Sequence, residues 1–398
     1  MGAQSKRLFF IDAMRAWAIL MMLQGHFIDG LLDPIFRNPE HLSYSIWLYF
    51  RGITAPVFFT VSGFIFTYLL LRSPQIGFEN PRIKKGIRRG VQLLLIGYLL
   101  RFNLFGLFKG ELYSSFYLVD VLHCIGLSIL VIIGIYLFSA SKKTYVFPAL
   151  LIGITLLLFL FEPLYKQWSF AFLPTALANY FTKANGSVFT ILPWLGYATI
   201  GGFLSLWFTK FKNNLRLYPV AIGIAITVGT FLIFFSSPAF VGLYELTGIS
   251  LFQLIQSNNY LFIRLGDVFL VFAVFMLIRR ILTHPTILTI GASTLSIYVI
   301  HFIVLYGSFT GLGLYKFLHH QLTPWWAISG AVGFMALCTF SAIQYGKRET
   351  AIKARLSTAM EIVRLELYAI SKLVQLIAKN VVLRLRIFIN RLFAITRN

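Results

Sequence analysis

An apolar stretch near the N-terminus reads Phe10-Ile-Asp-Ala-Met-Arg-Ala-Trp-Ala-Ile-Leu-Met-Met-Leu-Gln-Gly-His26, and it carries three ionisable side chains. Charge inside a membrane helix is costly, so such residues usually serve a function. Arg15 and His26 lie eleven residues apart. At about 100° and 1.5 Å per residue, both side chains leave one helix face, about 16 Å apart along the axis. Asp12 precedes Arg15 by one turn and can neutralise its guanidinium. We interpret this pattern as a polar stripe on a membrane helix.

The composition agrees with a membrane location. Hydrophobic residues make up 58% of the 398 residues, and several apolar runs approach twenty residues, which is typical of a polytopic α-helical membrane protein. The first apolar segment carries Asp12 and Arg15 and lacks a small-residue cleavage site, so we expect no cleaved signal peptide. Cys124 and Cys338 both lie in apolar runs, and we expect packed thiols that say nothing about redox compartment.

The apolar runs predict an all-α fold with about ten transmembrane helices. Lys and Arg concentrate in alternate connections, so by the positive-inside rule we expect both termini in the cytoplasm. This orientation places ionisable residues of six spans, among them Arg101, Arg264 and Asp267, toward the outer side, where a polar cavity explains them economically. The predicted spans are 9–31, 46–71, 88–108, 116–139, 143–161, 189–208, 217–236, 261–279, 286–309 and 325–345.

The chemistry of such a cavity depends on its imidazoles. A neutral histidine can take a proton from an attacking hydroxyl or amine, or can itself be acylated. Arginine cannot act as a base, so Arg15 is expected to orient a substrate or to counter a negative group that approaches from the cytoplasmic side. A helix–helix hydrogen bond is the alternative role for His26, although the face shared with Arg15 favours function. For the pairs Asp120/His123 and Arg264/Asp267 structural pairing is favoured, and Arg51 and Arg101 lie near enough to span ends to snorkel.

Two further stretches carry small and polar residues. Pro56 and the pair Ser62-Gly63 lie inside the second predicted span, where they can bend the helix or admit a close neighbour. The stretch Gly291–His301 brings hydroxyl groups, Tyr298 and His301 onto one predicted helix, which can present them to one interior.

These motifs resemble the membrane acyltransferase superfamily. Arg15 and His26 match the arginine, ten residues and a histidine that acyltransferase-3 members share. The stretch Phe58–Phe64 is similar to the phenylalanine-rich Ser-Gly motif of the second span, and Gly291–His301 resembles the late Gly-x-x-Ser-Leu-x-x-Tyr-x-x-His signature. The branch related to lysosomal heparan-α-glucosaminide N-acetyltransferase is the closest in pattern, through Ile11–Arg15, Arg51–Pro56, Asp120–Gly126 and Pro193–Gly196. The chain departs from its relatives at Ala16, where glycine is common, and at His123, where that branch tends to carry glutamine.

The resemblance implies transfer of an acyl group, usually acetyl from cytoplasmic acetyl-CoA, to a sugar or other cell-envelope acceptor across a bacterial inner membrane. His26, Arg15 and Asp12 would then be the catalytic residues, with Arg15 also on the donor side, and no metal is required. The anionic nucleotide of acyl-CoA would dock on Arg82, Lys84, Lys85, Arg88 and Arg89. The acceptor would be bound by Asp120, His123, His301, Tyr298, Arg51 and Ser62.

The C-terminal segment predicts a separate unit. We expect a transmembrane acyltransferase-like domain over 1–345 and a basic tail over 346–398. From Lys347 to Asn398 the chain has eleven Lys or Arg, three Glu and no Pro or Gly, which favours a helix lying on anionic headgroups at the cytoplasmic face. The tail could also dock a partner or form a homodimer. The net charge of +22 is assigned to loops and tail rather than to nucleic-acid binding, because no reader motif accompanies it. The apolar positions of the tail helix are Ile362, Leu365, Leu373, Ile377, Val381, Leu385, Phe388 and Leu392.

A second class of function fits the buried charges. Proton-coupled transporters and lipid or glycan flippases also carry intramembrane Asp, Arg and His. Carriers often consist of two related halves, and the pattern of Asp12, Arg15 and His26 has no second copy in the sequence. We therefore favour the enzyme over the carrier, and a receptor or structural role explains the buried charges least well.

Overall fold

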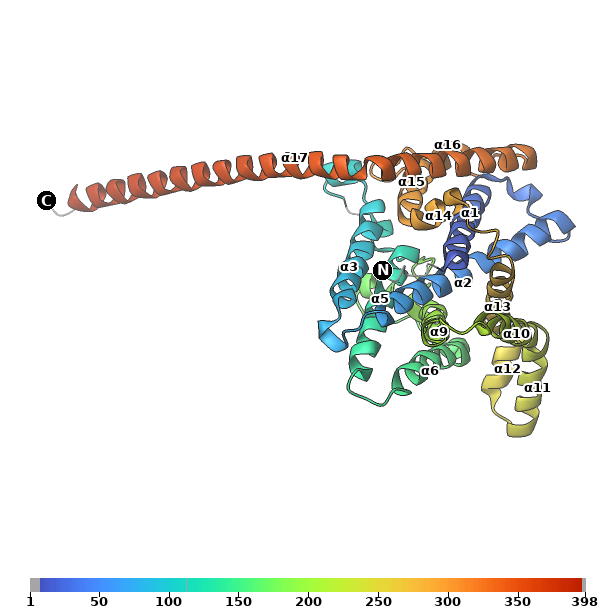
Figure 1. Cartoon of the computed structure of the whole chain (residues 1–398). Coiled ribbons are helices and arrows are strands. Elements are labelled where there is room, and N and C mark those ends of the chain that lie inside the picture. Colours follow the sequence, from blue (N-terminus) through green and yellow to red (C-terminus); the bar gives the residue numbers. More distant parts are fainter. Residues whose placement is uncertain (1–7, 112, 396–398) are drawn as a thin grey trace. The chain divides into compact units, whose positions relative to one another are not determined.

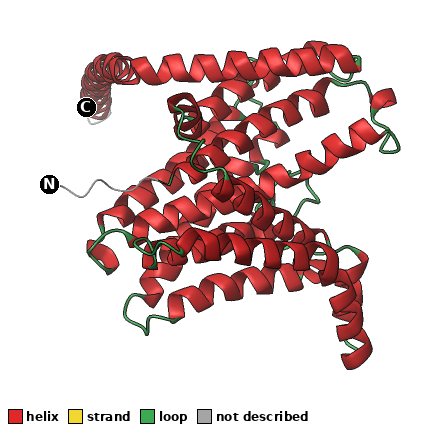
Figure 2. Ribbon diagram, turned by 45° about the vertical axis from the view of Figure 1, so that its right-hand side comes forward, coloured by secondary structure: helices red, strands yellow, loops and turns green. Residues whose placement is uncertain are grey.

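The computed structural model describes residues 8–111 and 113–395, and the part of the chain that it describes is all-helical and contains no β-strand. Figures 1 and 2 show the helices and their connections. The chain divides into two compact units, residues 1–342 and 343–398, while the predicted acyltransferase-like domain over 1–345 and the predicted membrane-surface tail over 346–398 stay predictions.

Ten helical regions correspond to the ten predicted spans. Among the described residues, six helices are long and apolar enough to cross a membrane, or seven if the bent pair α14–α15 counts as one span. The molecule therefore has the helices of an integral membrane protein, while the count of ten and the sides of the termini stay predictions. The main helices of these regions are α1 (Phe9–Leu31), α2 (Leu42–Leu71), α3 (Pro81–Leu100), α5 (Val121–Ser139), α6 (Val146–Leu160), α9 (Ile191–Lys210), α10 (Leu217–Thr230), α13 (Tyr260–Leu277), α14 (Pro285–Ala292), α15 (Thr294–Tyr306) and α17 (Pro324–Ile395).

Short helices join these elements. A π-turn at Phe231–Phe235 continues α10 into α11, so this segment extends past the predicted end at residue 236. The short helices are α4 (Leu104–Phe108), α7 (Glu162–Tyr165), α8 (Thr175–Ala178), α11 (Ser236–Thr247), α12 (Ser250–Ser257) and α16 (Leu314–Leu318).

The third predicted span was shifted along the chain. Helix α3 begins seven residues before the predicted start at 88, because Asn80 caps it by accepting a hydrogen bond from the backbone N–H of Arg82, and Pro81 occupies its first position. It ends at Leu100, and Asn103 caps the separate helix α4. Hydropathy favoured the apolar half of this helix, whereas the capping residues determine its ends.

The predicted span 286–309 is not one straight helix. Helices α14 and α15 meet at Ser293 and are bent by 68° relative to each other. Gly291, just before the bend, lies so close to the backbone of Asp12 that a side chain there would collide with it. The bend therefore lets this region contact α1 at two separate levels.

Glycines allow the closest helix contact of the first unit, between α2 and α9. A methyl group at Gly63 would collide with the carbonyl of Ala198, and one at Gly201 would collide with the carbonyl of Thr60. This confirms the close approach expected at Ser62-Gly63. Phe59 lies beside Trp194 and Thr67 lies beside Gly202, so the two helices run in the same direction.

Other contacts give further helix directions. In α3 and α5, Gly97 faces His123 and Gly86 faces Ile133, so these helices run in opposite directions. These directions agree with predicted spans that cross the membrane alternately in one direction and the other. Helices α2 and α9 correspond to the second and sixth spans, which should run the same way. Helices α3 and α5 correspond to the third and fourth spans, which should run opposite ways.

The second unit consists of residues 343–398. It is helical as far as Ile395, and every described residue from Ala351 to Leu383 is exposed, including Ile362 and Leu365. The proposed amphipathic face also depends on side chains outside the described residues, namely those of Leu373, Ile377, Val381, Leu385, Phe388 and Leu392.

The glycine contact between α2 and α9 predicts a large effect of one methyl group. Gly63→Ala should lower the free energy of unfolding by about 1–3 kcal/mol, because overpacking forces the helices apart. Gly153→Ala in α6 is the matched control, since a methyl group there meets no atom within 4 Å, and alanine is the better helix former. Thermal unfolding of the detergent-purified protein should show a lower midpoint for Gly63→Ala only. Equal midpoints would contradict the packing described here.

Candidate functional site

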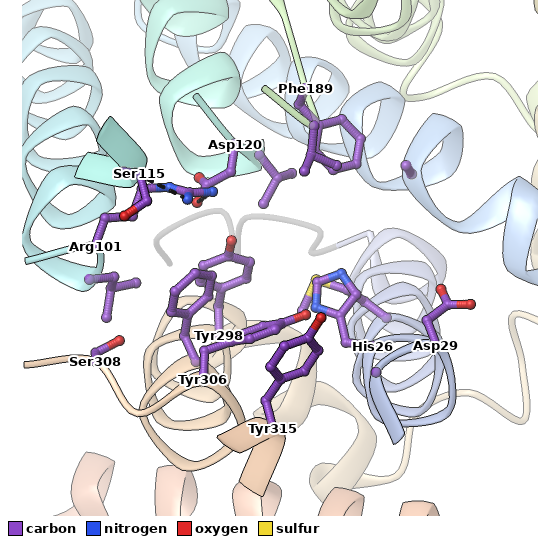
Figure 3. A pocket seen from close by; sticks show the side chains of 18 of the residues that line it. His26, Asp29, Arg101, Ser115, Asp120, Phe189, Tyr298, Tyr306, Ser308 and Tyr315 are labelled. Carbon is purple, nitrogen blue, oxygen red and sulfur yellow. Dashed lines mark hydrogen bonds and ion pairs between the residues drawn. The ribbon is translucent and has the colours of Figure 1, made fainter. Parts of the chain in front are cut away.

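A cavity of the first unit has a volume of about 850 Å³. Its walls come from α1, α2 and α15, from the C-terminal end of α3, from the residues around Asp120 before α5, and from the loop before α9. Figure 3 shows that polar side chains from these separate segments point toward one space. Of the predicted site residues, His26, Arg51, Asp120 and Tyr298 line it.

His26 is the central side chain of this cavity. Its Nδ1 lies 3.1 Å from Nε2 of His301, which is fully buried behind it. The other ring nitrogen of His301, Nδ1, lies within hydrogen-bond distance of the backbone carbonyl of Tyr298. A carbonyl oxygen only accepts, so His301 Nδ1 carries the proton and His301 Nε2 accepts one from His26 Nδ1. This assignment leaves Nε2 of His26 with its lone pair, and His26 forms part of the cavity wall.

Arg15 and Asp12 lie nearer the N-terminal end of α1 than His26 does. The Arg15 guanidinium is 3.7 Å from the Asp12 carboxylate and donates a hydrogen bond of 3.0 Å to Thr294 Oγ1 on α15. The cavity lining on α1 begins at Met21, six residues after Arg15, which is about 9 Å along the helix axis. Arg15 and His26 therefore contact the same partner helix at two levels, and Arg15 lies outside the cavity lining.

Two ion pairs face the cavity. Arg51 of α2 pairs with Asp29 of α1, and Arg101 at the end of α3 lies 3.3 Å from Asp120. All four residues line the cavity. The Arg101 side chain is only 14% exposed and pairs with Asp120. It therefore lies in the cavity wall, whereas its position near a span end suggested that it would snorkel.

His123 has a structural place in α5. Its Nδ1 lies 3.2 Å from the Asp120 carboxylate, and the two residues form a capping box at the helix N-terminus. The His123 ring packs against Gly97 and lies 4.4 Å from the ring of Tyr98. His123 lies outside the cavity lining, in agreement with the structural pairing favoured for this pair.

Ser62 also lies outside the cavity lining. Its hydroxyl donates a hydrogen bond of 2.7 Å to the carbonyl of Phe58 in the same helix, which is the local bond that serine commonly makes inside helices.

Sequence reasoning missed several cavity residues. Tyr306 at the end of α15 has its ring 6.2 Å from that of His26, and Tyr315 of α16 has its ring 5.7 Å from that of Tyr306. In Figure 3 both phenols lie on the same side of the cavity as His26. The chain returns to the cavity because Gly307 and Gly311 adopt positive φ values of 72° and 67°. Glycine at these positions was the only local signal of that turn. Asp29, Ser115, Lys183 and Trp194 also line the cavity.

The basic residues predicted to bind the CoA nucleotide lie on the other half of α3. Arg82, Lys84, Lys85 and Arg88 are exposed and Arg89 is half-buried. Arg89 and Arg101 are twelve residues apart, about 18 Å along the axis. The basic cluster and the cavity therefore occupy opposite ends of one helix.

Arg264 and Asp267 tie two helices together. Their side chains form an ion pair of 2.9 Å, and the hydroxyl of Tyr49 on α2 donates a bond of 2.6 Å to Asp267. The Arg264 guanidinium also lies 4.6 Å from the centre of the Tyr49 ring. This network agrees with the structural role favoured for the pair. No group of three or more His, Cys, Asp or Glu side chains with the geometry of a metal site occurs in the described part of the chain.

A family model described as an acyltransferase domain, acyltransferase-3, matches residues 8–343. No curated protein matches the chain significantly. The matched residues include α1 and α15, the helices that carry His26 and His301, and they make up most of the chain. The protein therefore belongs to the acyltransferase-3 family.

Proposed function

We propose that this membrane acyltransferase moves an acyl group, most simply acetyl, from cytoplasmic acyl-CoA to a hydroxyl or amine of a cell-envelope molecule, with His26 as general base. The observation that carries the proposal is the bond from His26 Nδ1 to His301 Nε2, which leaves the second nitrogen of His26 as a proton acceptor at the cavity wall. The family match supports acyl transfer in general.

The proposed step balances without a metal. His26 Nε2 takes the proton of the acceptor O–H or N–H while that oxygen or nitrogen attacks the thioester carbonyl. The new C–O or C–N bond forms, the C–S bond breaks, and the CoA thiolate receives the proton from the imidazolium. His301 would stabilise that imidazolium, since its Nε2 accepts from His26 Nδ1.

The rest of the cavity suits a sugar-like acceptor. The ion pairs Arg51–Asp29 and Arg101–Asp120 offer donors and acceptors to hydroxyl groups. Trp194 and Tyr306 add flat apolar faces to the lining. The motifs similar to the heparan-α-glucosaminide N-acetyltransferase branch point in the same direction, and a bacterial inner membrane fits an envelope acceptor.

The acyl-CoA donor would approach from the basic end of α3, opposite to the end that carries Arg101. The exposed basic residues of α3, between Arg82 and Arg89, provide positive charge for the CoA phosphates. Arg15 would contact the donor between that surface and His26. Because the lining on α1 stops at Met21, thioester entry requires the segment between Arg15 and Met21 to open. The basic tail would lie on anionic headgroups of the cytoplasmic membrane face, and it could also dock a partner or a second copy of the chain.

Release of free CoA tests the proposal. Reconstituted protein supplied with acetyl-CoA and a cell-envelope extract should release CoA, and His26→Ala should lower the rate by about 10²–10⁴-fold, the usual contribution of a general base. His41→Ala, an exposed histidine at the start of α2, should keep the wild-type rate. If the wild type neither binds acyl-CoA nor releases CoA, the chemistry proposed here is wrong, and substrate transport by the wild type should be measured next.

The role of His301 predicts a graded effect. His301→Ala should lower kcat by about 10-fold to 100-fold with little change in KM, because His26 would lose the partner that sets its tautomer. His301→Gln should recover part of kcat, since its amide oxygen can accept from His26 Nδ1. Steady-state kinetics of both variants provide the measurement. Equal kcat losses in the two variants would argue against a hydrogen-bonding role.

Removing positive charge from the basic surface of α3 should weaken the binding of acyl-CoA without affecting the chemical step. Lys84→Gln combined with Lys85→Gln should raise KM for acyl-CoA several-fold and leave kcat unchanged, because each exposed charge contributes about 0.2–1 kcal/mol. Lys142→Gln with Lys143→Gln, in the connection between α5 and α6, removes the same charge elsewhere. A similar KM change in both double variants would assign the effect to net charge alone.

A further inference from the structure

A second cavity lies between four helices, away from His26. It has a volume of about 310 Å³ and is formed by α6, α9, α10 and α13. Every lining residue except Thr155 is hydrophobic. The Thr155 hydroxyl already has hydrogen-bond partners within the protein, since it lies 2.8 Å from the Thr199 hydroxyl and donates to the carbonyl of Gly196. The cavity therefore offers its occupant almost purely apolar contact.

The cavity is elongated along the helices. On α13 its lining runs from Phe262 to Met276, fourteen residues, or about 21 Å along the axis. On α9 it runs from Ile200 to Phe208, or about 12 Å. One leaflet of a bilayer contributes about half of the 30 Å hydrocarbon core. The groove thus has the length of one lipid acyl chain lying parallel to the helices.

A basic hollow adjoins one end of this groove. It has a volume of about 360 Å³, and the described residues that line it include Arg279 and Arg280 but no acidic side chain. Arg279 follows Met276 of the groove by one turn and donates a bond of 2.7 Å to its carbonyl. The Arg279 guanidinium lies 4.0 Å from the centre of the Tyr218 ring.

Aromatic rings form a wall common to the groove and the hollow. Phe10 and Tyr218 line the hollow, and Phe208 and Phe272 line the groove. The Phe10 ring lies 5.5 Å from that of Phe208 and 6.3 Å from that of Phe272. The Tyr218 ring lies 6.0 Å from that of Phe208. A molecule with a hydrocarbon chain in the groove would therefore place its polar end beside the two arginines.

We propose that the groove and the basic hollow bind one anionic phospholipid, with an acyl chain between α9, α10 and α13 and its phosphate at Arg279 and Arg280. The segment Leu217–Thr247, which contains α10, has only 17% of its most apolar window buried by protein, so a bound chain supplies packing that the fold leaves open. The site is separate from the acyl-transfer cavity, because Phe10 and His26 are sixteen residues apart on α1, about 24 Å along the axis.

Trp207 reports on the groove. It lines the cavity and its side chain is partly exposed, so lipids with brominated acyl chains should quench its fluorescence on contact. The protein in detergent is titrated with brominated phosphatidylglycerol or with phosphatidylcholine bearing the same chains. The difference between wild type and Trp207→Phe isolates the contribution of this residue. We expect phosphatidylglycerol to quench at an about thirtyfold lower mole fraction, because about 1 kcal/mol from each of the two arginines amounts to about 2 kcal/mol.

Matched variants separate this site from general surface charge. Arg279→Gln with Arg280→Gln should abolish the preference for phosphatidylglycerol, whereas Lys142→Gln with Lys143→Gln should retain it. Ala221→Phe, which fills the groove from α10, should reduce quenching by both lipids. Ala239→Phe on the exposed face of α11 should not. Thermal unfolding confirms that each variant is folded.

Three results would overturn the proposal. Equal quenching by the two lipids in wild type would remove the headgroup assignment. Loss of the preference in the Lys142/Lys143 variant would assign it to overall charge. Displacement of brominated phosphatidylglycerol by palmitoyl-CoA at an equal mole fraction would assign the groove to the acyl donor instead.

Discussion

Helix α1 can carry Arg15 and His26 because α15 supplies a partner for each along one face of α1. Arg15 donates to Thr294, and His26 bonds to His301, one level further along both helices. An unpaired polar group is expensive in a membrane interior, so these contacts determine how the two regions pack. The bend at Ser293 belongs to the same arrangement, since Gly291 packs directly on the Asp12 backbone while α15 turns to follow α1.

The same contacts fix the hydrogen bonding of His26, on which the proposed chemistry depends. His301 is itself held by the carbonyl of Tyr298, so the chain of bonds leaves one nitrogen of His26 available at a cavity of about 850 Å³. The Arg101–Asp120 and Arg51–Asp29 pairs keep charged groups in the cavity wall without leaving any of them isolated. The exposed basic half of α3 lies at the opposite end of the helix that delivers Arg101. One helix thus connects the surface proposed for a phosphorylated donor with the cavity proposed for the acceptor.

The helices were predictable to the extent that hydropathy controls them. The all-helical fold of the described residues follows from apolar runs, because a membrane segment must satisfy its own backbone hydrogen bonds. Helix ends were less predictable. Asn80 and Pro81 start α3 within a polar stretch, and the break at Ser293 depends on the contact of Gly291 with another helix. Neither feature changes the local hydropathy enough to be read from it.

By itself, the sequence determined the helical membrane character, the shared face of Arg15 and His26, and the family motifs, because periodicity and composition act locally along the chain. Only the tertiary structure decided that His301 is the partner of His26, that Arg101 faces the cavity while His123 caps a helix, and that Tyr306 and Tyr315 return to the site. These outcomes depend on which residues meet across 275 positions in the case of the two histidines. Such meetings are set by helix packing and by turns at glycine, and spacing along one helix carries no information about them.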